Sequence, residues 1–80
     1  MTEQALIEFI ESELLPGSGA GPIDADTELI LSGLLDSLAV MRLVAHIEKQ
    51  RGAKLPETGM VLENFTTVGA MRRYLESLEE

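Results

Sequence analysis

The stretch S-G-L-L-D-S-L-A-V, residues 32–40, joins an apolar segment to the start of a helical pattern. Asp36 is a residue type that caps helix N-termini, so the pattern predicts a helix that begins at Ser37. Apolar residues then recur at helical spacing along one side, namely Val40, Leu43, Val44 and Ile47. Gly52 follows the last turn, as is common at helix C-termini. The sequence therefore predicts a helix over residues 37–51 whose apolar side faces a core.

The Ser37 hydroxyl has no evident structural role in this helix. Because Asp36 already supplies the cap, we expect Ser37 to present its hydroxyl to solvent; the alternative is that Ser37 itself helps to cap the first turn. A second group of residues, Leu38, Met41 and Ala45 with Arg42 beside them, lies on the side away from the core. This group, together with Asp36, predicts a partner-binding surface. Met41 fits such a surface but could equally lie beneath the preceding loop, and the sequence leaves both possibilities open.

Two more segments have clear helical periodicity. Thr2 is a plausible cap for a first helix, which Pro16 and Gly17 end. Thr67 is a plausible cap for a last helix, with an apolar stripe of Val68, Met71, Leu75 and Leu78. Between these two helices and the one at 37–51 lie less regular segments, and no segment alternates over strand length.

We also make specific predictions for the irregular segments. Residues 16–36 form a long loop, which we expect to be ordered because an idle linker would not carry its apolar residues Ile23, Leu29, Ile30, Leu34 and Leu35. A short helical turn is expected around residues 28–31. Residues 60–65 predict a short helix that contributes Val61, Leu62 and Phe65 to the core. The prediction is an all-α fold, a single domain over residues 1–80, with three longer helices, one short helix and a long first loop.

The net charge of −8 is unevenly distributed. Residues 1–36 contain eight acidic and no basic residues, whereas residues 37–80 contain six of each. An acidic surface repels phosphate backbones and anionic lipids, so nucleic-acid and membrane partners are not expected. The acidic N-terminus resembles neither a signal peptide nor a membrane span, which predicts a soluble cytoplasmic protein.

The residues of this chain do not match the spacing of common catalytic or metal-binding sites. His46 follows Ser37 by nine positions, about 13 Å along the predicted helix, so the two cannot form a nucleophilic pair, and His46 is expected on the solvent side. Asp24, Asp26 and Glu28 have the spacing that opens a calcium loop, but Leu29 stands where that loop needs glycine. The chain has no cysteine. We therefore expect neither a metal site nor an enzyme.

At residues 33–38 the chain resembles the acyl and peptidyl carrier proteins, whose modification signature contains Asp-Ser-Leu. The resemblance extends over nearly the whole chain: an acidic first helix, a long loop ending at the serine, a Leu-Pro break at Leu55, and Thr66-Thr67-Val68 opening the last helix. It implies that Ser37 accepts 4′-phosphopantetheine from coenzyme A through a phosphopantetheinyl transferase. The thiol of that arm would hold cargo as a thioester between an adenylating loading ligase and an acceptor enzyme.

One departure from the family concerns charge. Residues 37–54 contain four basic residues and one acidic residue, whereas fatty-acid carriers typically have a strongly acidic helix here. This difference favours a specialised pathway, such as one for activated amino acids, and the length suggests a free-standing monomeric carrier. The alternative is an unmodified acidic adaptor that binds one partner stably through Leu38, Met41 and Ala45.

Overall fold

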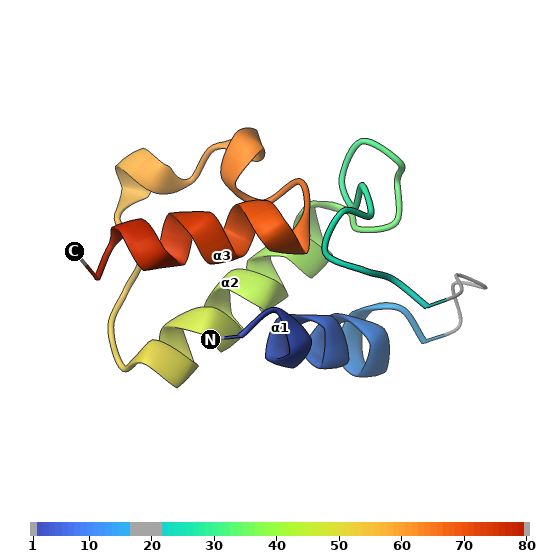
Figure 1. Ribbon diagram of the computed structural model, residues 1–80, viewed down its shortest axis with the longest axis horizontal. Helices are drawn as coiled ribbons and strands as arrows, with labels where there is room; N and C mark the ends of the chain where they lie inside the picture. Colours follow the sequence, from blue (N-terminus) through green and yellow to red (C-terminus); the bar gives the residue numbers. More distant parts are fainter. Residues whose placement is uncertain (1, 17–21, 80) are drawn as a thin grey trace.

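The computed structural model describes residues 2–16 and 22–79, and its helices are arranged as Figure 1 shows. Helix α1 (Glu3–Phe9) continues into a π-helical segment (Ile10–Leu14), α2 spans Ser37–Arg51 and α3 spans Val68–Ser77. Two short 3₁₀ helices, Glu57–Gly59 and Leu62–Asn64, lie between α2 and α3. The described residues contain no strand, which confirms the predicted all-α class.

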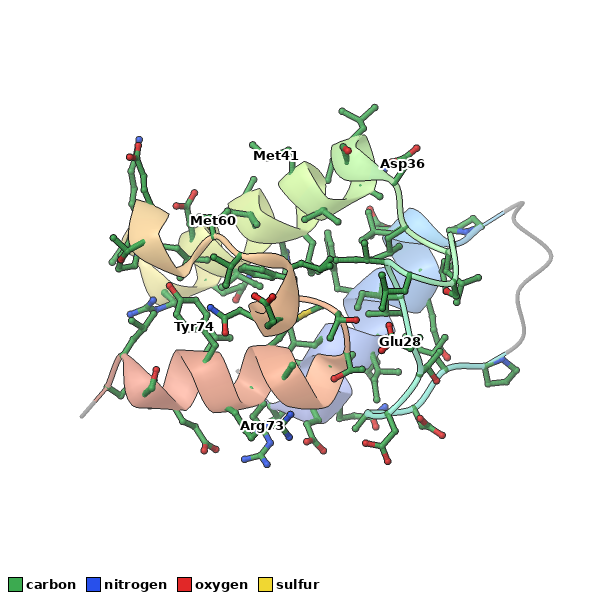
Figure 2. All side chains as sticks on the ribbon, turned by 90° about the horizontal axis from the view of Figure 1, so that it is seen from above. Glu28, Asp36, Met41, Met60, Arg73 and Tyr74 are labelled. Atoms are coloured by element: carbon green, nitrogen blue, oxygen red, sulfur yellow. The ribbon has the colours of Figure 1, made fainter. Side chains whose placement is uncertain are left out.

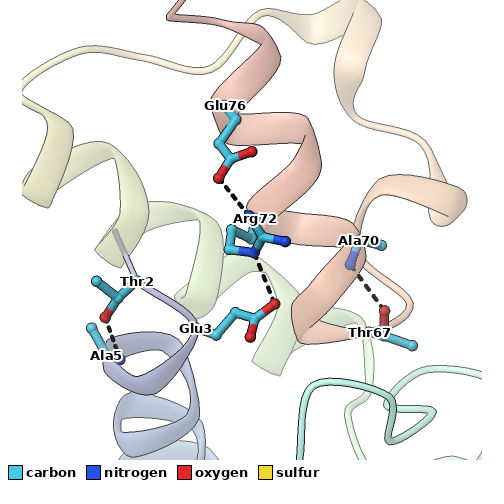
Figure 3. A network of polar contacts seen from close by, with 7 residues as sticks. All are labelled: Thr2, Glu3, Ala5, Thr67, Ala70, Arg72 and Glu76. Carbon is cyan, nitrogen blue, oxygen red and sulfur yellow. Dashed lines mark hydrogen bonds and ion pairs between the residues drawn. The ribbon is translucent and has the colours of Figure 1, made fainter.

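Side-chain caps begin all three helices where the sequence predicted them. The Thr2 hydroxyl accepts a hydrogen bond from the Ala5 N–H at 3.1 Å, and the Thr67 hydroxyl accepts one from Ala70 at 3.0 Å (Figure 3). Each cap satisfies a backbone donor that would otherwise lack a partner within the helix. Gly52 ends α2 in the left-handed conformation at φ 71°, which a residue with a side chain adopts only at a cost.

The core lies between the three helices and under the long loop. Its largest side chains without solvent exposure come from all of these parts: Leu6, Ile10, Leu29, Leu43, Ile47, Val68 and Met71. An ion pair on the surface adds a link between the chain ends, because Arg72 on α3 donates to the Glu3 carboxylate at 2.8 Å and also pairs with Glu76 (Figure 3). The hydrogen bond to Glu3, followed by that to Glu76, raises the pKa of the Arg72 guanidinium above its ordinary value.

The predicted order of the long loop is confirmed over its described part, residues 22–36. Ile23, Leu29 and Leu35 are buried, and Ile30 and Leu34 pack partly against the core. The loop crosses the end of the bundle at which α2 and α3 begin, and its backbone is tied to that end (Figure 1). The Leu29 N–H donates to the Thr66 carbonyl and the Gly69 N–H to the Ala25 carbonyl, both at 2.9 Å.

Two local expectations were wrong. Instead of a helical turn at residues 28–31, the loop makes a hydrogen-bonded turn from Ile30 to Gly33. The short helix expected within residues 60–65 is present as the second 3₁₀ helix, and Phe65 is buried as predicted. Val61 and Leu62, however, are 44% and 45% exposed instead of contributing to the core.

His46 also differs from its expected position on the solvent side of α2. Its ring is half-buried and stacks on the ring of Phe9, with ring centroids 3.8 Å apart and an interplanar angle of 11°. A flat contact between α1 and α2 accounts for this position, because the imidazole covers an aromatic face that would otherwise be exposed.

No helix in residues 2–16 or 22–79 combines the length and the apolar character that crossing a membrane requires.

Candidate functional site

Ser37 is exposed and is the first residue of α2, where the structure holds it between two local constraints. On the N-terminal side, the Leu35 N–H donates to the Leu29 carbonyl at 2.8 Å, and both leucine side chains are buried. On the C-terminal side, the regular turns of α2 begin. The backbone at Ser37 is therefore fixed while its hydroxyl lies on the surface.

Asp36 is the N-cap of α2, as predicted. Its Oδ1 accepts a hydrogen bond from the Ala39 N–H at 2.8 Å, and its backbone is extended. This contact leaves Ser37 without the capping role that was its structural alternative. Gly33, three residues earlier, has φ 84°, and this left-handed conformation lets the loop turn into the helix start.

An open apolar groove with a volume of about 590 Å³ begins beside Ser37. One wall is the start of α2, and the other is the segment that carries the two 3₁₀ helices. Figure 2 places Met41 and Met60 on these two walls, with Asp36 at one end. The lining residues are Ile30, Leu35, Asp36, Ser37, Val40, Met41, Met60, Val61, Leu62 and Phe65. Asp36 and Ser37 are thus the polar residues of an otherwise apolar groove.

The predicted partner-binding residues lie together on the surface next to Ser37. Leu38 and Met41 are 71% and 60% exposed, and Arg42 and Ala45 are exposed as well. The exposure of Met41 decides the question that the sequence left open: Met41 lines the groove and is not covered by the loop. Arg42 reaches toward the π-helical segment that follows α1, where its Nη1 donates to the Glu13 carbonyl at 3.2 Å.

Sequence reasoning missed the far wall of the groove. Val61 and Leu62 were assigned to the core, and Met60 and Ile30 had no assigned role in a site. Helical periodicity carries no information about this wall, because the segment is not a regular helix. The one available signal was the number of large apolar residues in 60–62 for so short a segment.

The other candidate constellations do not form sites. The Asp24 Oδ1 accepts hydrogen bonds from the Asp26 N–H and the Thr27 hydroxyl, and the Glu28 carboxylate binds the Thr66 hydroxyl. These acidic groups therefore organise the loop. In the described part of the chain, no group of three or more potential ligands is placed to hold a metal ion. His46 contacts Phe9 and is not directed at Ser37.

The residues around Ser37 fit a long covalently attached group. The exposed hydroxyl offers an attachment atom, and the groove offers an apolar surface along which such a group can lie. A phosphate linked to a helix start is also in a favourable electrostatic setting, worth roughly 0.3–1 kcal/mol.

Comparison with known proteins agrees with this geometry. Residues 6–75 match the family model described as "Phosphopantetheine attachment site". No curated protein sequence matches the chain significantly. Among solved structures, a chain in one titled "Crystal structure of FAD-dependent dehydrogenase" is 38% identical, with a TM-score of 0.78, over 89% of this chain and 99% of the other.

A second solved structure is the Bradyrhizobium japonicum glycine:[carrier protein] ligase complexed with glycylated carrier protein. The match has a TM-score of 0.72 and 21% identity, and it covers 89% of this chain and 95% of the other, so it supports the fold alone. Domains of the matched family bind 4′-phosphopantetheine covalently and serve as carriers without catalysing a reaction themselves. With 70 consecutive residues matched, the chain belongs to the family of phosphopantetheine-attachment domains.

Proposed function

We propose that this chain is a carrier protein in which Ser37 bears 4′-phosphopantetheine, and that the thiol of this arm holds an acyl or aminoacyl group as a thioester. The observation that carries the proposal is the position of Ser37, which is exposed, fixed at the start of α2 and located at the end of the apolar groove. The serine needs no activation by its own chain, since a transferase supplies the base and the metal ion. The thiol comes with the arm, which agrees with a chain that has no cysteine.

The carrier would exchange its cargo between two kinds of enzyme. An adenylating ligase would load the thiol, and an acceptor enzyme would modify or remove the bound group. An activated amino acid is one candidate cargo, because residues 37–54 lack the strongly acidic character that is typical of fatty-acid carriers. We expect these partners in the cytoplasm, and we expect their complexes with a monomeric carrier to be small and short-lived, because each partner must release it.

The 38% identical neighbour supports a candidate for the acceptor enzyme. The match covers 89% of this 80-residue chain and 99% of the other chain, so the two chains are similar in length. The structure that contains the other chain is nevertheless titled as an FAD-dependent dehydrogenase. A flavoenzyme acting on carrier-bound cargo would break two C–H bonds, form one double bond in the cargo and reduce FAD to FADH₂. We therefore name a flavin-dependent dehydrogenase as a candidate acceptor.

Intact mass measures the attachment directly. The chain is incubated with coenzyme A, Mg²⁺ and a broad-specificity phosphopantetheinyl transferase, and we expect its mass to rise by one phosphopantetheine. Ser37→Ala should show no gain, because the attachment atom is absent. Ser32→Ala is the matched control, since Ser32 is exposed in the loop that precedes Ser37, and it should be modified normally.

Two results would contradict the carrier proposal. One is a mass gain in Ser37→Ala, which would move the attachment to another residue. The other is no gain in the unsubstituted chain, which would favour the alternative, an unmodified adaptor that binds its partner through Leu38, Met41 and Ala45.

A further inference from the structure

Both walls of the apolar groove carry an exposed methionine. Met41 on α2 is 60% exposed, and Met60, which follows the 3₁₀ helix Glu57–Gly59 on the other wall, is 37% exposed (Figure 2). Met71 on α3 is instead fully buried in the core. The groove therefore holds two accessible thioethers, whereas packing protects a third one elsewhere in the bundle.

The composition makes these thioethers the side chains that a peroxide oxidises most readily. The chain contains neither cysteine nor tryptophan, so no thiol or indole of its own competes for the oxidant. In the reaction, the sulfur lone pair forms an S–O bond to one peroxide oxygen while the O–O bond breaks. The sulfur loses two electrons, and hydrogen peroxide is reduced to water.

Oxidation would change the chemical character of the groove. Apart from Asp36 and Ser37, its lining residues are apolar. A thioether packs against an apolar group without losing a strong hydrogen bond, whereas a sulfoxide oxygen is a hydrogen-bond acceptor that loses its water when it is covered. Because Met41 and Met60 lie on different walls, an apolar group in the groove would cover polar oxygens on both sides.

We propose that Met41 and Met60 form a reversible oxidation site, at which a peroxide weakens the binding of apolar groups in the groove. Methionine sulfoxide reductases reverse the change with an external dithiol: the S–O bond breaks, its oxygen leaves as water, and the dithiol becomes a disulfide. The chain has no thiol that could do this itself. The site consists of the groove and two sulfur atoms and does not require an arm on Ser37.

Peptide mapping tests which methionines react. Cleavage after glutamate places Met41, Met60 and Met71 in separate peptides, residues 29–48, 58–63 and 64–76. When the folded chain is treated with dilute hydrogen peroxide, we expect Met41 and Met60 to be oxidised at least about tenfold faster than Met71, which reacts only when the core opens. Met1 lies outside the described residues, and its peptide, residues 1–3, is read separately. Similar rates for the three methionines would overturn the proposal.

The fluorescence of a neutral apolar probe, N-phenyl-1-naphthylamine, tests the effect on the groove. We expect the dissociation constant of the probe to be about threefold to tenfold higher for the oxidised chain than for the untreated chain. Reductases for both sulfoxide epimers should restore the original value. The melting temperature should shift by less than about 4 °C, because both oxidised side chains are exposed.

The double variant Met41→Leu, Met60→Leu is the matched control, since leucine has a similar volume and no sulfur. Its affinity for the probe, whatever its value, should be the same before and after peroxide treatment. Weaker binding after treatment of this variant would assign the effect to another methionine and overturn the proposal. Absence of probe binding by the untreated chain, or an affinity that oxidation leaves unchanged, would also overturn it. The carrier proposal is tested separately by the mass gain at Ser37, so either proposal can fail without the other.

Discussion

Gly59 lies against the ring of Tyr74, in the segment that forms the far wall of the groove. A Cβ on Gly59 would lie 1.8 Å from the Tyr74 hydroxyl oxygen and 2.3 Å from Cζ of the same ring. The tyrosine ring also packs edge-on against Phe65, with centroids 6.0 Å apart, which limits how far it can move. Glycine is therefore needed at position 59 for space, and its φ is not the reason.

We expect Gly59→Ala to destabilise the fold by about 1–3 kcal/mol, because the added methyl group displaces the tyrosine ring. Urea unfolding measures the loss. In a double-mutant cycle with Tyr74→Ala, the methyl group should cost much less, since the ring it strikes is gone. Additive losses in that cycle would contradict the contact.

The Tyr74 hydroxyl is itself a separate feature. It is buried and has no hydrogen-bond partner among the described residues. Since burial of an unpaired hydroxyl is unfavourable, Tyr74→Phe should leave the free energy of unfolding unchanged or raise it, by up to about 1 kcal/mol. The same urea titration checks this, and a loss above that size would show that the hydroxyl is paired in solution.

At the scale of the elements, the Asp36 carboxylate at the start of α2 combines a capping bond with a negative charge beside Ser37, and substitutions can separate the two. Asp36 caps the helix through Ala39, and it also lies next to the proposed attachment residue at the end of the groove. Asparagine keeps a capping oxygen but loses the negative charge, whereas alanine loses both.

We expect Asp36→Asn to change the free energy of unfolding by less than about 0.5 kcal/mol and Asp36→Ala to lower it by about 1 kcal/mol. If partners recognise the charge, both variants should slow arm transfer by the transferase to a similar extent. Thermal unfolding and the initial rate of mass gain measure the two effects. A normal rate for Asp36→Asn together with a slow rate for Asp36→Ala would mean that only the cap matters.

At the scale of the whole molecule, the loop joins the parts that position Ser37. It contacts the start of α3 through Gly69 and Thr66, and it is also tied to the π-helical segment that follows α1, because the Ile23 N–H donates to the Glu11 carboxylate at 2.9 Å. Leu29 is fully buried within this arrangement, whereas Leu31, two residues later, is 71% exposed. Leu29 and Leu31 can therefore be compared as a buried and an exposed leucine of the same loop.

Leu29→Ala should lower the free energy of unfolding by about 2–5 kcal/mol, because a cavity remains where the side chain packed. For a domain of this size that is a large part of the total stability. Leu31→Ala should change it by less than about 0.5 kcal/mol. Chemical denaturation of both variants provides the measurement, and equal effects would mean that the loop does not pack on the core in solution.

The sequence by itself determined the parts that depend on nearby residues. Asp36 and Gly52 mark the two ends of α2 because a capping bond and a left-handed glycine act within one turn of the chain. The outward position of Leu38 and Met41 follows from helical periodicity once α2 is assigned. The match of the Asp-Ser-Leu signature with helix order and length likewise indicated the family.

Only the tertiary structure decided what lies beside Ser37. Met60, Val61 and Leu62 line the groove instead of filling the core, and Met41 stays uncovered. The loop instead lies against the π-helical segment and the start of α3, to which the backbones of Ile23 and Leu29 are hydrogen-bonded. The stacking of His46 on Phe9 likewise joins residues of different helices. Such positions depend on which side chains from separate elements fill one small core. Apolar periodicity within a single element does not contain this information.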